Sequence, residues 1–282
     1  MIKFGASILS WILPDWKAVE GEYAIKKTAA AGFDLLEILL PPSRKIETAT
    51  VRKQLKENRI EAVCSFNLPA NSHIPFYPDK ALSDIKWALD IAKELDSRIL
   101  AGVLHSGIGV FSGAVKTSTE QDTVVQVLSD AADYAERLGI VICIEPINRY
   151  ESYICNVASD VLNLIDQVGS SALAVHLDTF HMNIEEENFS DPVLKSGYLL
   201  RHLHITESNR GMPTEGNVRW DDLFQALADI NYQGALVLEN FSSSIAGMSA
   251  RVNLWQPSKY DADELAAGSL AFIKRKALEY GL

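Results

Sequence analysis

Residues Ile140–Glu145, which read IVICIE, decide the fold class of this 282-residue chain. Consecutive apolar residues, most of them β-branched, are typical of a strand buried on both faces, and such strands occur in parallel sheets. Amphipathic helices are expected on either side, over Val124–Leu138 and Val157–Val168. The stretch therefore predicts a repeated strand–helix arrangement in an α/β protein.

The same alternation continues in both directions along the chain, with no linker or low-complexity break. The expected strands are Lys3–Leu9, Phe33–Leu39, Ile60–Phe66, Ile99–Leu104, Ile140–Ile144, Leu173–Leu177, Leu199–Ile205 and Gly234–Leu238. The expected helices include Glu20–Ala31, 81–95, Val124–Leu138, Val157–Val168, a weak one over Ser190–Ser196, Trp220–Ile230 and Glu264–Tyr280. Eight such units favour a single (β/α)₈ TIM barrel domain over residues 1–282. A Gly-x-Gly-x-x-Gly turn after the first strand is missing, which disfavours a dinucleotide-binding sheet.

Composition narrows the functional class. The chain has 26 basic and 37 acidic side chains, for a formal net charge of -11, which disfavours a protein that binds nucleic acid. No apolar run approaches the ~20 residues that span a membrane. Three cysteines cannot all pair, and the apolar start, Met1–Leu13, is not followed by a small-residue cleavage site. These features predict a cytoplasmic protein that acts on a small molecule.

Four side chains that can bind a metal follow the last four expected strands. Glu145 follows the fifth strand, Asp178 the sixth, His204 ends the seventh, and Glu239 follows the eighth. The carboxyl ends of the strands form the active-site face of a (β/α)₈ barrel, so these side chains should meet there.

Each of the four alone has a plainer interpretation, as a helix cap, a surface charge or a hydrogen-bonded core histidine. Together they favour a metal, because three converging carboxylates repel one another unless a cation compensates them. Oxygen ligands with one imidazole suit Mn²⁺, Mg²⁺ or Co²⁺.

A second group of polar residues lies shortly after three of these ligands. Glu151, His181 and Arg210 are expected in the loops that follow the strands, where they either contact a bound molecule or pair with neighbours on the rim. Four aromatic residues near strand ends either wall the pocket or pack in the core. They are Trp11, Trp16, Phe66 and Phe241.

At these positions the sequence resembles the D-tagatose 3-epimerase family, which includes D-psicose (D-allulose) and L-ribulose 3-epimerases, within the xylose-isomerase-like barrel superfamily. The stretches that carry the resemblance are CIEPINRYE (Cys143–Glu151), HLDTFHMNIEE (His176–Glu186), LHITESNR (Leu203–Arg210) and DINYQGALVLENF (Asp229–Phe241). The resemblance implies a ketose 3-epimerase that interconverts C3 epimers of a free keto-sugar through an enediolate.

The resemblance also implies residue roles. Residues matching Glu145, Asp178, His204 and Glu239 hold one divalent metal ion per subunit, Mn²⁺ foremost and Co²⁺ or Mg²⁺ as alternatives. Those matching Glu145 and Glu239 also form the proton-transfer pair.

The implied substrate contacts are Glu151, His181 and Arg210, with Cys64 and Phe241 as pocket walls. The resemblance further implies a homodimer or homotetramer.

Three departures from the family pattern concern the part of the pocket that reads the far end of the sugar. Gly107 stands where family members often have tryptophan, Gly211 where a second arginine is frequent, and Asn240 where proline is common. The identity of the ketose is therefore left open by the sequence.

Other functions stay open. The main alternative is a sugar or inosose isomerase or dehydratase on the same metal barrel. A metal-dependent endonuclease for apurinic sites is disfavoured by the acidic charge and the six histidines. A non-catalytic sugar-binding barrel would not need the two candidate bases, yet both are present.

Overall fold

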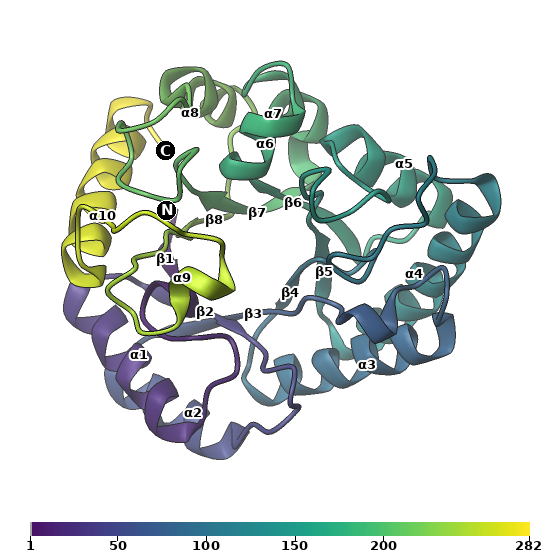
Figure 1. Cartoon of the computed structure of the whole chain (residues 1–282), viewed down its shortest axis with the longest axis horizontal. Coiled ribbons are helices and arrows are strands. Elements are labelled where there is room, and N and C mark those ends of the chain that lie inside the picture. Colours follow the sequence, from purple (N-terminus) through teal and green to yellow (C-terminus); the bar gives the residue numbers. More distant parts are fainter. Residues whose placement is uncertain (1) are drawn as a thin grey trace.

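Eight parallel strands close into a barrel in the computed structural model, which describes residues 2–282 (Figure 1). Closure is shown by β1, which pairs with both β2 and β8. The strands are β1 (Phe4–Ser7), β2 (Leu35–Leu39), β3 (Glu61–Ser65), β4 (Ile99–Gly102), β5 (Val141–Ile144), β6 (Leu173–Asp178), β7 (Leu200–Ile205) and β8 (Ala235–Leu238). The predicted (β/α)₈ barrel is confirmed.

Helices surround the barrel on its outside (Figure 1). The α-helices are α1 (Ala18–Ala31), α2 (Thr48–Asn58), α3 (Pro78–Glu94), α4 (Ser118–Leu138), α5 (Ala158–Val168), α6 (Thr179–Glu185), α7 (Asp191–Ser196), α8 (Trp220–Asp229), α9 (Met248–Arg251) and α10 (Ala262–Glu279). Short 3₁₀ helices are η1 (Ile8–Ser10), η2 (Ala70–Ser72) and η3 (Gly197–Leu199).

Several boundaries differ from the sequence-based expectation for local reasons. The first strand ends at Ser7, because the Ser7 side chain accepts a hydrogen bond from the Leu9 amide and starts η1. Helix α4 begins before the expected Val124, because Thr117 and Glu120 form a capping box. Helix α6 was not expected at all. It starts directly at the end of β6, where the Asp178 side chain accepts from the Phe180 amide.

Alternation along each strand divides side chains between the barrel interior and the helix layer. Two small apolar clusters belong to the interior: Leu35, Val63 and Val237, and Ala101, Cys143 and Ala174. Two residues further along five of these strands lie Glu37, Ser65, Glu145, His176 and Glu239, which all line one cavity. The barrel interior is thus apolar at its base and polar at its mouth.

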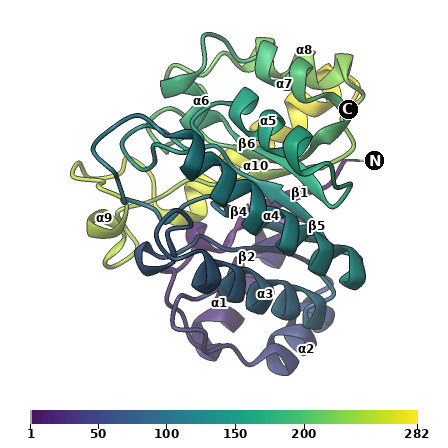
Figure 2. The same ribbon diagram turned by 90° about the vertical axis from the view of Figure 1, so that its right-hand side faces the viewer.

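The two ends of the barrel differ in what covers them. In Figure 2 both termini lie at one end, whereas α9 and several long loops lie at the other. These loops follow the carboxyl ends of the strands and surround the polar mouth. Within residues 2–282, no helix combines the length and apolarity needed to cross a membrane.

The helix layer supplies much of the buried apolar surface, so one core residue tests the packing. Phe224 on α8 is fully buried, whereas Leu278 on α10 is 83% exposed. We predict that Phe224→Ala lowers the free energy of unfolding by about 3–5 kcal/mol, from lost burial and the cavity left behind. The matched control, Leu278→Ala, should change it by less than about 0.5 kcal/mol. Urea denaturation followed by circular dichroism measures both, and equal effects would contradict this packing.

Candidate metal centre and active site

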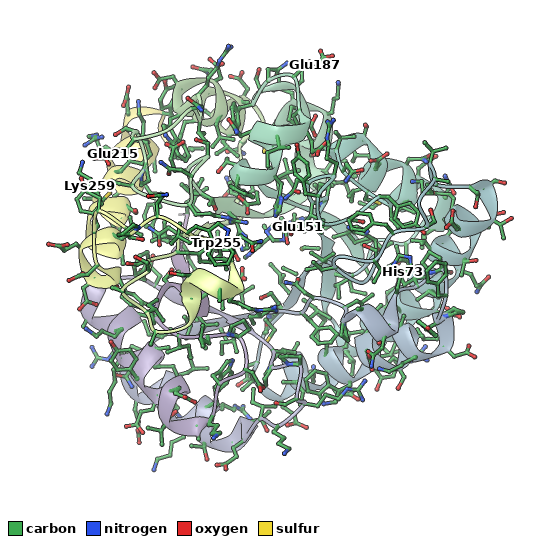
Figure 3. The ribbon with its side chains drawn as sticks, in the orientation of Figure 1. His73, Glu151, Glu187, Glu215, Trp255 and Lys259 are labelled. Carbon is green, nitrogen blue, oxygen red and sulfur yellow. The ribbon has the colours of Figure 1, made fainter. Side chains whose placement is uncertain are left out.

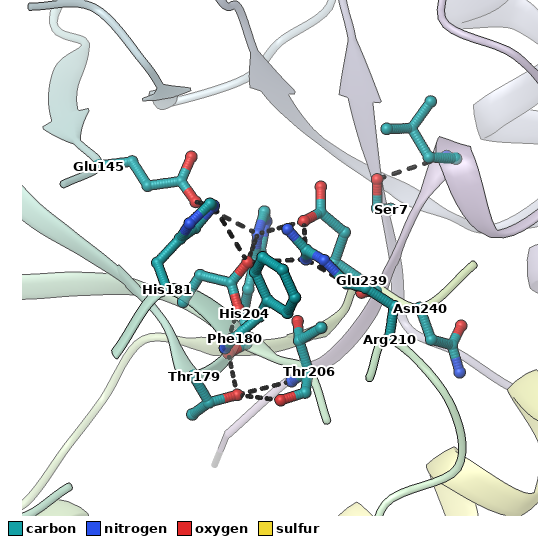
Figure 4. A network of polar contacts seen from close by, with 12 residues as sticks. Ser7, Glu145, Thr179, Phe180, His181, His204, Thr206, Arg210, Glu239 and Asn240 are labelled. Atoms are coloured by element: carbon teal, nitrogen blue, oxygen red, sulfur yellow. Dashed lines mark hydrogen bonds and ion pairs between the residues drawn. The ribbon is translucent and has the colours of Figure 1, made fainter. Parts of the chain in front are cut away.

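The barrel mouth brings together the four predicted metal ligands from four consecutive strands. His204 Nδ1 lies 3.9 Å from Glu145 Oε1, 3.9 Å from Asp178 Oδ2 and 3.4 Å from Glu239 Oε2. Figure 4 shows Glu145 and Glu239 approaching His204 from opposite sides. The backbone ends of β6 and β7 are tied together here, since Thr179 Oγ1 donates to the Thr206 carbonyl and accepts from its amide.

The orientation of the His204 ring leaves one nitrogen free for a ligand bond. Its Nε2 contacts Glu37 Oε2 at 2.7 Å, and a carboxylate can only accept, so Nε2 carries the proton. Its Nδ1 is buried and has no hydrogen-bond partner among residues 2–282. Ligand atoms of Glu145, Asp178 and His204 all lie within 4.8 Å of one another. An unpartnered imidazole nitrogen facing three carboxylates fits a divalent cation.

Arg210 neutralises part of the acidic cluster. Its Nη1 donates to Asp178 Oδ2 at 2.8 Å and to Glu239 Oε2 at 2.6 Å. The guanidinium lies between two aromatic rings, 4.0 Å from the centre of Phe180 and 4.9 Å from that of Phe241. Arg210 therefore holds a cationic group directly against two of the four candidate ligands, and Phe241 contacts the site through it.

The acidic cluster shifts the pKa values of its members in opposite directions. Burial raises the pKa of Glu145 well above its ordinary value, and the carboxylates of Glu239 and Asp178 raise it further. The His204 ring lowers this pKa, but by less than burial raises it. Burial alone would also raise the pKa of Asp178, but the Arg210 guanidinium brings it below its ordinary value. Glu145 and Asp178 therefore differ in proton affinity although their oxygens lie a few ångströms apart.

His181 lies on α6, which corrects the expectation that it belongs to a loop. Its Nδ1 accepts from the Asn148 amide at 3.1 Å, and its Nε2 lies 3.9 Å from both Glu145 Oε1 and Asp178 Oδ2. Burial lowers the pKa of His181 to about 4, so its ring is neutral at pH 7 and Nε2 is the protonated nitrogen. His181 therefore presents an N–H donor to the cluster.

Glu151 lies near the barrel axis, in the loop after β5 (Figure 3). Its Oε1 accepts from Asn148 Nδ2 at 3.1 Å, and its backbone carbonyl accepts from the Gly109 amide. The same Asn148 side chain contacts His181 Nδ1. Asn148 thus joins two predicted substrate contacts, a link that sequence reasoning missed because the residue carries no charge.

Cys64 lies away from the cavity, contrary to its predicted place as a pocket wall. Its neighbours along β3, Val63 and Ser65, face the barrel interior, so the intervening side chain points toward the helices. It is fully buried in the main hydrophobic core.

Three of the four aromatic residues near strand ends are core residues by their packing and hydrogen bonds. The Trp11 and Trp16 indole nitrogens donate to Thr28 Oγ1 and to the Leu39 carbonyl, and Phe66 packs edge-on against Trp87. Phe241 alone of the four contacts the acidic cluster, through Arg210.

Glu37 is a site residue that sequence reasoning missed. It lies inside β2, two residues before the strand ends at Leu39, and it is 2% exposed. The signal was present, because a glutamate in the otherwise apolar run FDLLEIL is unusual in a strand buried on both faces.

Gly107, in the loop after β4, lies too close to the loop after β3 to carry a side chain. A Cβ at Gly107 would lie 2.9 Å from the Pro69 carbonyl oxygen and 3.0 Å from the Ala70 Cα. The loops after β3 and β4 therefore approach too closely for the tryptophan frequent in the resembling family.

The cavity lined by the cluster has a volume of about 20 Å³. That space holds about one species the size of a water molecule or an ion. A small-molecule pocket has roughly 300–1,000 Å³, so this cavity alone is too small to enclose such a ligand.

Comparisons with known proteins agree with this site. The family model described as xylose isomerase-like TIM barrel matches residues 25–276. The chain is 34% identical to an L-ribulose 3-epimerase of Methylomonas sp., with 98% of each chain covered, and 34% identical to a D-psicose 3-epimerase of Agrobacterium fabrum, with 92% and 94% covered. The crystal structure of a D-allulose 3-epimerase from Methylomonas sp. in complex with D-allulose superposes with a TM-score of 0.92, at 34% identity, over 98% of this chain and 97% of that one.

The match spans nearly the whole chain and includes the strands that carry the acidic cluster. This chain belongs to the xylose isomerase-like TIM barrel family and, within it, to the family of the D-psicose and L-ribulose 3-epimerases.

Proposed function

We propose that this protein is a divalent-metal-dependent ketose 3-epimerase that acts on a free keto-sugar. The observation that carries the proposal is the placement of Glu145 and Glu239 on opposite sides of His204, within one cluster of candidate metal ligands. The relatives that bear this activity in their names support it. The cytoplasmic location and the dimeric or tetrameric assembly expected from the sequence remain part of this proposal.

Inversion at C3 of a ketose needs a base on each face of that carbon. One carboxylate breaks the C3–H bond and takes the proton, while the electron pair moves to the C2 carbonyl oxygen and gives an enediolate. The other carboxylate returns a proton to the opposite face. Glu145 and Glu239, which lie on opposite sides of His204, fulfil these two roles.

The donor set of Glu145, Asp178, His204 and Glu239 would hold the divalent cation, with Mn²⁺ favoured over Co²⁺ and Mg²⁺. The cation supplies Lewis-acid polarisation of the substrate carbonyl and hydroxyl oxygens. Such a cation and the Arg210 guanidinium compensate the same two carboxylates. Arg210 is therefore the side chain placed to turn toward a substrate oxygen, beside the His181 N–H donor and Glu151.

A substrate panel tests the reaction class. We predict that the metal-loaded enzyme exchanges deuterium from D₂O into C3 of ketoses such as D-psicose, D-tagatose or L-ribulose and forms their C3 epimers. Nuclear magnetic resonance follows both events. Exchange or water loss with keto-inositols, or aldose formation, without any C3 epimer would instead support the isomerase or dehydratase alternative.

The two carboxylates can be tested separately. We predict that Glu145→Gln and Glu239→Gln each lower epimerisation by more than about 10²-fold, because each removes one of two bases. Each variant should still exchange the C3 hydrogen of one epimer, and the two variants should act on opposite epimers.

The control for these variants is Glu215→Gln. Glu215 pairs with Lys259 at the outer edge of the barrel, far from Glu151 at the axis (Figure 3), so its loss should leave the rate unchanged. Metal content is measured for all three variants. Near-wild-type epimerisation by Glu145→Gln or by Glu239→Gln would show that the replaced carboxylate is not one of the two bases.

Metal removal gives an independent prediction. Dialysis against a chelator should abolish epimerisation, and Mn²⁺ or Co²⁺ should restore it, because the acidic cluster needs a cation to bind and polarise the substrate. Activity and metal content are measured in parallel. Full activity in protein shown to be metal-free would refute the metal-dependent scheme.

A further inference from the structure

Glu37 is a wholly buried carboxylate at the floor of the metal cavity. A buried charge is costly unless it is paired and hydrogen-bonded. Glu37 meets both conditions, because its Oε2 accepts from His202 Nε2 at 2.5 Å and from His204 Nε2 at 2.7 Å, while Oε1 accepts from Ser65 Oγ at 2.9 Å. Every oxygen of Glu37 therefore has a defined donor.

These contacts hold the carboxylate of Glu37, which belongs to β2, from two other strands. Ser65 belongs to β3, and His202 and His204 are alternate residues of β7 that both face the interior. His202 lies one layer below His204 and uses the same oxygen, so the position of Oε2 is determined independently of His204. The ring of His176 packs edge-on against both histidine rings, at 4.6 and 4.3 Å between centres.

We propose that Glu37 is a positioning residue that makes His204 a metal ligand, by holding its Nε2–H so that the Nδ1 lone pair faces Glu145, Asp178 and Glu239. This inference rests on the proposed metal site. Metal-bound histidines generally donate their second N–H to a carboxylate or carbonyl, which fixes the tautomer and makes the ligand nitrogen more basic. Here the buried β2 carboxylate supplies that acceptor.

A purely structural role predicts something different. If Glu37 merely satisfied two buried imidazoles, its loss would reduce stability but leave metal binding of the folded protein unchanged. If it positions His204, the proton of the metal-free imidazole can move to Nδ1 once Glu37 is replaced, and the ligand nitrogen is lost. Metal affinity and imidazole tautomer therefore separate the two roles.

The test uses the full-length protein, freed of metal, and Mn²⁺ as the probe. Isothermal titration calorimetry should show that Glu37→Gln binds Mn²⁺ about 10–100-fold more weakly than wild type. Asp84→Asn is the matched control, because Asp84 is an equally buried carboxylate on α3 that pairs with Lys80 and does not line the cavity. Its Mn²⁺ affinity should stay within about twofold of wild type.

A second readout concerns the imidazole itself. Long-range ¹H–¹⁵N spectra of the metal-free wild type should show His204 protonated at Nε2, where it contacts Glu37, and Glu37→Gln should show a population that has lost the Nε2 proton and is protonated at Nδ1. Should Glu37→Gln fail to fold by circular dichroism, Ser65→Ala replaces it, because it removes the donor that orients Oε1. Weaker Mn²⁺ binding by Ser65→Ala is then expected.

The outcomes are distinct. A folded Glu37→Gln protein with wild-type Mn²⁺ affinity and an unchanged tautomer overturns the inference, as does unchanged affinity in Ser65→Ala where that variant replaces it. A wild-type protein that binds no Mn²⁺ instead overturns the proposed metal site. The inference about Glu37 then falls as well, because it requires a metal ligand to position.

Discussion

Charge compensation at the barrel mouth is the constraint on which the rest of this site depends. Three carboxylates converge on one imidazole in a small buried cavity, and like charges at such distances are strongly unfavourable without a cation. Arg210 supplies part of the compensation, held between two aromatic rings. A divalent ion in the same cluster would complete the charge compensation. The ion proposed to polarise the substrate would then also stabilise the folded site.

The barrel satisfies this constraint through strand parity. Each strand places alternate side chains inside, so an apolar base and a polar mouth arise two residues apart on the same strand, as Cys143 and Glu145 show. The same parity directs Cys64 outward between Val63 and Ser65. This alternation contradicts the role as a pocket wall that the resemblance implied for Cys64.

Much of the candidate site was predictable because strand ends are visible in the sequence. Glu145, Asp178, His204 and Glu239 each follow or end a short apolar run, and parallel closure brings such ends together. The boundaries were harder, since capping by Thr117 and Asp178 depends on side-chain hydrogen bonds that apolar periodicity does not register. Helix α6, which carries His181, was missed for that reason.

By itself the sequence determined the eight strand–helix units, the acidic balance and the set of residues able to bind a metal, because periodicity and residue chemistry are local properties. Only the tertiary structure decided which of them meet. Glu37 on β2 reaches His204 on β7 across the barrel interior, and Arg210 turns back from its loop to two carboxylates. Such contacts join residues far apart in the chain, and barrel closure, which no single segment encodes, sets their distances.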